Sequence, residues 1–292
     1  MTGWIVTVAG VTVVLFVLTD MFHTLANPGA LGRLSRTMLR LTWTLSSRNR
    51  LSGPLAMLAV VMIWGVLAVL GWAAVYWPHM DDGFSHATEH GSGPGALDAV
   101  YVSLVTISTL GLGDVFPTSA WLRLVNPLEA LFGFALLTVA VSWVLQVFPT
   151  LARRRELALR LVHLQEAGTV DLLGSLDRTV VHSLLTDLAA SVTRVRVDLH
   201  DYPETYYFRE PEDVGSLAEA IPVASRLVEA ARTSPVVEVR HGGAVLGAAL
   251  DDLAEVLQRS FLRPCATTDE ALRVFLADHS SGGAAGRRPA PS

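Results

Sequence analysis

The chain has 292 residues, of which 51% are apolar and 17% are charged, a composition that excludes an ordinary soluble protein and indicates a membrane protein. Its formal net charge of −5, with no basic face suited to phosphate, excludes a nucleic-acid partner. The single cysteine, Cys265, excludes an intrachain disulfide framework.

Three apolar segments, residues 3–26, 55–78 and 126–150, are each long enough to cross a bilayer, whose apolar core requires about 20 helical residues. No arginine precedes the first segment and no small-residue cleavage site follows it, so we interpret it as a transmembrane helix rather than a secretory signal peptide. A fourth apolar stretch, residues 96–110, is too short to span and leads into a glycine-rich turn, which favours a re-entrant segment.

Arginines flank these segments unevenly. They follow the first segment at Arg33, Arg36, Arg40, Arg48 and Arg50, and the third at Arg153, Arg154, Arg155 and Arg160. The positive-inside rule therefore places both stretches in the cytoplasm and the N-terminus outside. The loop after the second segment carries Asp81, Asp82 and Glu89 but no arginine, which agrees with an external location.

Within residues 27–54, basic and apolar side chains fall on opposite faces of a predicted helix. The basic face has Arg33, Arg36 and Arg40, and the apolar face has Leu34, Met38, Leu41 and Leu45. This pattern is typical of a helix that lies on the inner leaflet with its arginines near anionic headgroups. Arginines at this spacing also occur in voltage sensors, but this stretch is too polar to span a membrane.

The sequence TLGLG at residues 109–113 has the pattern of an ion-selective filter. Rings of backbone carbonyls can replace the water around a dehydrated cation. Successive carbonyls reach one axis only if the backbone adopts conformations that side chains disfavour, so glycine is expected at alternate positions, as at Gly111 and Gly113. The hydroxyl of Thr109 would complete the innermost cage, below the carbonyls of Thr109, Leu110, Gly111 and Leu112.

Residues 97–108 are expected to form a pore helix in front of this filter. Its C-terminal end carries partial negative charge and would favour a cation in the cavity below, while Asp98 would complement the positive end. Asp114 follows the filter at the outer mouth, where it can attract cations and form hydrogen bonds behind the filter.

The pattern T-x-x-T-x-G-x-G-D, formed by Thr106, Thr109, Gly111, Gly113 and Asp114, resembles the signature of potassium channels. Residues 55–150 resemble the pore domain of bacterial two-helix and two-pore-domain potassium channels, here preceded by an extra N-terminal helix. The resemblance implies K+ bound at the filter carbonyls. The family's commonest filter has tyrosine at the position of Leu112, and that phenol braces the filter. Because each chain has one pore loop and four surround an ion, the resemblance implies a homotetramer.

The third span is expected to line the cavity. Gly133 lies where inner helices of this family carry a hinge glycine, although a small residue there equally suits a close helix contact. By family register, the pore-lining residues would be Phe134, Leu137, Val141 and Leu145, whose apolar side chains could close the pore by dewetting.

Several polar residues near these spans have more than one possible role. Glu129 could brace the filter or reach the membrane interface, and we favour the interface; Asp20 is expected to reach the headgroups. His79, His86 and His90 could bind zinc or sense protons, but their spacing follows no zinc pattern, which favours a solvated loop.

Residues 151–279 are expected to form a mainly α-helical cytoplasmic domain, with a disordered tail over 280–292. The third span should continue to about Ala167 and end at Gly168, and further helices are predicted over 170–197, 216–232, 244–261 and 269–278. Ser216 and Glu219 form a candidate capping box, residues 202–211 a packed connection, and residues 236–240 a possible short strand. No G-x-G-x-x-G follows a strand, so a nucleotide-binding regulator is not indicated.

The sequence thus predicts an all-α membrane protein with three transmembrane helices and a re-entrant pore helix and filter loop. We expect a potassium-selective channel subunit of the cell membrane of a bacterium, without enzymatic activity or cofactor, in contact with membrane lipids and with an unknown cytoplasmic ligand or partner. One alternative is a weakly selective cation channel. Another is a membrane sensor whose helical domain uses His163 or His182 for phosphotransfer, although no ATP-binding portion follows.

Overall fold

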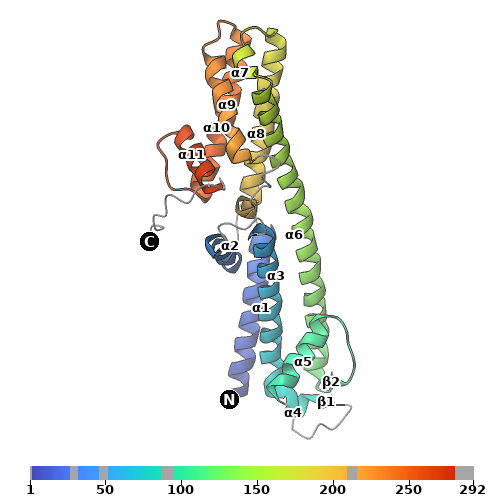
Figure 1. The fold of residues 1–292 in the computed structure, drawn as a ribbon. Coiled ribbons are helices and arrows are strands. Elements are labelled where there is room, and N and C mark those ends of the chain that lie inside the picture. The colour runs from blue at the N-terminus through green and yellow to red at the C-terminus, as the bar shows by residue number, and fades with distance from the viewer. Residues whose placement is uncertain (1, 27–31, 46–51, 87–94, 209–215, 280–292) are drawn as a thin grey trace. The chain divides into compact units, whose positions relative to one another are not determined.

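A computed structural model describes residues 2–26, 32–45, 52–86, 95–208 and 216–279. Its elements in chain order are α1 (Thr2–Ala26), α2 (Arg33–Leu45), α3 (Ser52–Tyr76), η1 (Trp77–His79), α4 (Met80–Gly83), β1 (Phe84–His86), α5 (Ala96–Ile107), β2 (Val115–Pro117), α6 (Ala120–Glu166), α7 (Thr169–Leu172), α8 (Arg178–Asp201), η2 (Pro203–Tyr207), α9 (Leu217–Arg232), α10 (Val237–Ser260) and α11 (Thr268–His279) (Figure 1). Helices α1, α3 and α6 are long and apolar enough to cross a membrane, which confirms the predicted all-α membrane protein.

The chain divides into two compact units, which are described separately. The first comprises residues 1–40 and 56–145, and the second residues 41–55 and 146–292. Helices α2 and α5 confirm the predicted amphipathic helix and the short helix before the glycine-rich turn. The predicted tail 280–292 lies outside the described residues.

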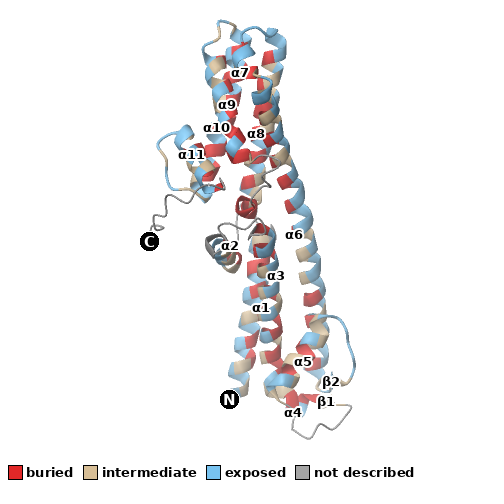
Figure 2. Cartoon of the chain, viewed as in Figure 1, coloured by how far each residue is buried: buried red, intermediate tan, exposed pale blue. Residues whose placement is uncertain are grey.

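In the first unit, α1 packs along α3 through small residues. Gly10 lies so near the other helix that a Cβ there would be 2.5 Å from the Gly71 carbonyl oxygen. Small residues let helix backbones approach closely in a membrane, where packing rather than hydrophobic burial drives association. Further buried residues of α1 are Val14, Val17 and Met21. Figure 2 shows the buried positions of each helix in red.

The expectation that Asp20 reaches the headgroups is wrong, because its side chain is buried at the junction of three helices. Its Oδ1 accepts a hydrogen bond from the backbone N–H of Leu34 at 2.9 Å. Its Oδ2 accepts from the Ser35 hydroxyl at 2.9 Å and from the indole N–H of Trp64 at 3.0 Å. A carboxylate on α1 thereby caps the N-terminus of α2, whose first-turn N–H groups have no partner in their own helix.

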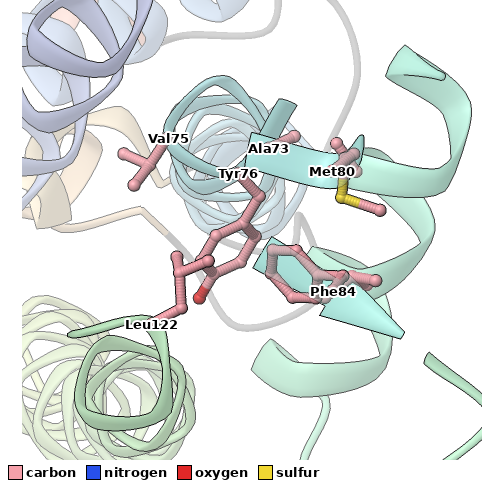
Figure 3. Packing of buried hydrophobic residues seen from close by; sticks show 8 residues of the cluster. Ala73, Val75, Tyr76, Met80, Phe84 and Leu122 are labelled. Carbon is pink, nitrogen blue, oxygen red and sulfur yellow. The ribbon is translucent and has the colours of Figure 1, made fainter. Parts of the chain in front are cut away.

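A small core forms between the end of α3 and the start of α6. Tyr76, Met80, Phe84 and Leu122 pack together there, with the Tyr76 and Phe84 rings 5.4 Å apart and edge to face (Figure 3). Strands β1 and β2 pair antiparallel beside this core. These strands were not predicted from the sequence, since three residues are too few for a periodic signal.

Helix α6 begins six residues before the predicted span and continues as one helix to Glu166. Gly168, with φ +63°, follows it, which confirms the predicted end of this helix. The left-handed conformation favours glycine because it has no Cβ.

The second unit is a helical bundle in which α9 and α10 approach at Gly243, where a Cβ would lie 2.5 Å from the Ala231 Cβ. The predicted strand over 236–240 is wrong, since α10 begins at Val237. The predicted helix over 170–197 is interrupted before Asp177, which caps α8 by accepting from the Thr179 N–H at 2.8 Å. This backbone hydrogen bond lowers the pKa of the Asp177 carboxyl.

The predicted packed connection is confirmed over its described part, where η2 is buried. The Tyr206 ring stacks on Phe261 with centroids 4.1 Å apart, and its hydroxyl donates to Asp278 Oδ2 at 2.8 Å. On α6, the buried guanidinium of Arg154 donates to the carbonyl oxygens of Thr205 and Phe208 at 2.9 and 2.6 Å. These contacts attach η2 to α6.

His279 in this core predicts a pH-dependent stability. Burial lowers the pKa of its imidazole from 6.5 to about 4, assisted by Arg154 and opposed by carbonyl contacts with Tyr206 and Phe275 and by Asp278. Between these pH values the unfolded chain binds a proton that the folded chain does not. We therefore expect the free energy of unfolding to fall by about 3 kcal/mol as the pH decreases from 6.5 to 4.

The measurement is thermal unfolding of the purified full chain in detergent across that pH range, beside His279→Gln. The glutamine keeps a donor near the Tyr206 carbonyl but cannot titrate, so the variant should show a flatter pH dependence. Equal slopes for the parent and His279→Gln would contradict the role of His279.

Candidate conduction site

The loop after α5 has left-handed backbone at alternate residues. The φ angles are +57° at Thr109, +56° at Gly111 and +77° at Gly113. A Cβ added at either glycine would meet no atom within 4 Å, so it is the backbone conformation and not lack of space that favours glycine there. The two glycines were expected for this reason, but the positive φ of Thr109 was not, since a threonine adopts positive φ at a cost of about 1 to 2 kcal/mol.

Helix α5 ends directly at this loop. The Thr109 N–H donates to the Thr106 carbonyl at 2.9 Å, and the Leu110 N–H donates to the Val105 carbonyl at 3.0 Å, so the chain turns tightly at the negative end of the helix. At the other end, Asp98 Oδ2 accepts from the Gly95 N–H at 2.7 Å. Asp98 therefore lies at the positive end of the α5 dipole, as expected, while the direction of the negative end toward a pore axis stays a prediction.

One side-chain hydrogen bond holds the loop itself, and a second holds the end of α5 that precedes it. The Tyr101 hydroxyl donates to Asp114 Oδ2 at 2.6 Å, and Asn126 Nδ2 donates to Thr106 Oγ1 at 3.0 Å. Leu112, by contrast, is 62% exposed and has no polar group. Asp114 and Thr106 thus each accept a side-chain hydrogen bond, from Tyr101 and Asn126, which were not predicted from the sequence. The supporting role of Asp114 and Thr106 at a filter stays a prediction.

Glu129 does not reach an interface, and the favoured reading of this residue was wrong. Its side chain is fully buried, with Oε2 accepting from the Tyr76 hydroxyl at 2.6 Å and Oε1 accepting from the Ser103 hydroxyl at 2.5 Å. One carboxyl group therefore links α3, α5 and α6. The available signal was that Asn126 and Glu129 lie three residues apart on an apolar helix and so share a face.

Gly133 packs directly against the end of α5. A Cβ there would overlap the carbonyl oxygen of Ile107, which supports the close helix contact that the sequence left open. A hinge role for Gly133 remains a prediction, because this contact does not test whether α6 bends there.

The four residues predicted to line the pore all present exposed side chains. Phe134, Leu137, Val141 and Leu145 are exposed by 50% to 66%, although they are large and apolar. Phe134 and Leu137 also contribute to a cavity of about 590 Å³ beneath the end of α5, which Thr109 and Val66 help to line. Such a face on a membrane helix is available for contact with lipid, water or another chain.

The predicted histidine cluster is only partly described, since His90 and Glu89 lie outside the described residues. His79 bonds with the Thr7 hydroxyl at 3.2 Å and lies edge to face with Trp4 and Trp121, at centroid distances of 5.7 and 4.9 Å. Among the described residues, no group of three or more His, Cys, Asp or Glu side chains is placed to hold a metal ion. His79, which lies in η1, thus contacts both the start of α1 and the start of α6.

The histidines considered for phosphotransfer lie on helices in the second unit. His182 Nδ1 is 2.9 Å from the Glu238 carbonyl oxygen, and its ring stacks on His241 at 6.0 Å. These contacts give His182 a packing role between α8 and α10.

Comparison with known proteins supports a channel. Residues 57–149 match the family model described as ion channel. An uncharacterized membrane protein of Bacillus subtilis (strain 168), YdjJ, is 28% identical over 120 residues, which are 41% of this chain and 34% of that protein. The chain thus matches about a third of the length of this relative. No solved structure matches. The matched family groups channels rather than enzymes.

Proposed function

Since residues 57–149 form an ion-channel domain and the apolar helix α1 precedes it, we propose that the chain is one subunit of a potassium-selective channel. The observation that carries this proposal is the left-handed backbone at Thr109, Gly111 and Gly113. Alternation of this kind lets successive carbonyls face one side of the chain, which a cation cage requires. The potassium ions would bind at the carbonyls of residues 109–112, with Gly113 and Asp114 at the outer mouth.

Four copies would surround the conduction axis. The filter side chains Leu110 and Leu112 are 66% and 62% exposed in one chain, and the α6 face from Phe134 to Leu145 is exposed below them. One loop offers carbonyls from one side only, so a closed cage needs a cyclic assembly. A homotetramer would cover both surfaces, and the α6 face would line the cavity.

The same proposal assigns roles to α2, to the start of α1 and to residues 151–279. The exposed Arg33, Arg36 and Arg40 of α2 would lie at the inner leaflet of the cell membrane near anionic headgroups, with the start of α1 outside. Residues 151–279 would form the cytoplasmic domain, which assembles the tetramer, transmits a stimulus to α6 or docks a partner.

The test is the reversal potential of the purified protein in a planar bilayer with potassium on one side and sodium on the other. We expect a value close to the potassium equilibrium potential. A reversal potential near zero would instead support the second candidate, a weakly selective cation channel, which the exposed Leu112 in place of a bracing phenol favours. Absence of any cation current from assembled protein would contradict both.

A further inference from the structure

Leu112 cannot brace the filter by a hydrogen bond, so the restraint must come from other side chains. The Tyr101 to Asp114 bond holds the outer end of the loop. We propose that Glu129 is a positioning residue that holds the pore helix α5 and thereby sets the ion selectivity of the filter; this inference rests on the proposed channel function.

The first support is the geometry of the carboxyl group. Each Glu129 oxygen accepts one short hydrogen bond, from Tyr76 on α3 and from Ser103 on α5, and all three side chains are fully buried. Tyr76 is itself fixed by the core around Phe84 and Leu122, into which its ring projects in Figure 3. A buried acceptor with two directed donors has little freedom to move, and loss of either partner leaves a buried polar group unpaired.

The second support is the set of contacts between α6 and α5. The two helices are in contact at three pairs of residues, which are Asn126 with Thr106, Glu129 with Ser103, and Gly133 with Ile107. Asn126 and Thr106 form a neutral hydrogen bond, and Gly133 meets the backbone of Ile107. Glu129 and Asn126 both also interact with Tyr76 on α3. Glu129 accepts a hydrogen bond from α3 and another from α5, whereas Asn126 donates to Thr106.

Ser103 lies close enough to the filter along the chain for its position to affect the bound ions. Ser103 lies about one turn before Ile107, where α5 ends, and Thr109 follows two residues after Ile107. A shift of α5 therefore moves the Thr109 carbonyl and hydroxyl. Discrimination between potassium and sodium depends on the size or stiffness of the carbonyl cage, so such a shift should reduce selectivity before it abolishes conduction.

The experiment compares Glu129→Gln, Ser103→Ala and Tyr76→Phe with the parent in bilayers. The amide of glutamine accepts through one atom only, and the other two variants each remove one donor. We expect the permeability ratio of potassium to sodium to fall by about tenfold in Glu129→Gln and by less in the two single-donor variants. Thr12→Val is the control, since the Thr12 hydroxyl is exposed and, within the described part of the chain, bonds to the Val8 carbonyl of its own helix.

A second measurement does not depend on conduction. Hydrogen–deuterium exchange of the purified full chain should be faster over residues 104–113 in Glu129→Gln than in the parent, and unchanged in Thr12→Val. If the parent is selective and Glu129→Gln keeps both its permeability ratio and its exchange rates, the role of Glu129 is refuted and the proposed function stands. If the parent does not conduct, the proposed function fails, and unchanged exchange would overturn the positioning role as well.

Discussion

Replacement of Gly111 by alanine is expected to abolish potassium flux while leaving the fold intact. Gly111 has φ +56°, a conformation that costs an alanine about 1 to 2 kcal/mol in each copy of the loop. A methyl group there would meet no atom of the described residues within 4 Å, apart from its neighbours in the chain, so the change acts on the backbone of the loop and not on packing. The measurement is potassium flux into liposomes that contain the purified protein.

The matched control is Gly174→Ala in the second unit. A Cβ at Gly174 also meets no atom within 4 Å, but its φ lies outside the left-handed region, so this substitution should leave flux unchanged. Both variants should elute from size-exclusion chromatography at the volume of the parent. Parental flux through Gly111→Ala would refute the assignment of the filter to residues 109–113.

Replacement of Asp20 by alanine is expected to cause the largest loss of stability in the first unit. The carboxylate accepts hydrogen bonds from Leu34, Ser35 and Trp64, all of which would lose their acceptor inside the protein. The cost should be about 3 kcal/mol or more, because unpaired buried donors cannot be hydrated. Thermal unfolding of the full chain in detergent would show this as a lower midpoint.

Two companion variants make the result specific. Asp20→Asn keeps one acceptor oxygen and should lose less stability than Asp20→Ala. Thr19→Val, at the neighbouring exposed position whose hydroxyl bonds to the Leu15 carbonyl of its own helix, should unfold like the parent. An unfolding midpoint of Asp20→Ala equal to that of Thr19→Val would show that Asp20 does not hold α2.

The membrane helices could be predicted closely because their signal is local. A run of about 20 apolar residues is sufficient to predict a spanning helix, and the start of α6 differed only because Ala120 to Val125 is less apolar than the rest. Helix α2 could be predicted for the same reason, because the helical spacing of its arginines is evident within a short stretch of sequence. The strand proposed for residues 236–240 was wrong because short apolar runs do not distinguish a strand from the first turn of a helix such as α10.

The buried carboxylates could not be predicted in the same way. A lone acidic residue near the end of an apolar segment is normally interpreted as one whose side chain reaches water. We expected this of both Asp20 and Glu129. Their donors, Trp64 for Asp20 and Tyr76 for Glu129, lie 44 and 53 residues away in the chain. A partner at that separation is defined only when the helices pack.

The sequence by itself therefore determined the membrane class, the three long apolar helices and the alternate glycines of the loop, because hydropathy and the conformational freedom of glycine are properties of single residues and short runs. Only the tertiary structure decided that Thr109 shares the left-handed backbone, that Tyr101 rather than residue 112 supports the loop, and that Asp20 and Glu129 join helices inside the protein. The reason is that a hydrogen bond between distant residues depends on their positions in space, which a linear pattern does not contain.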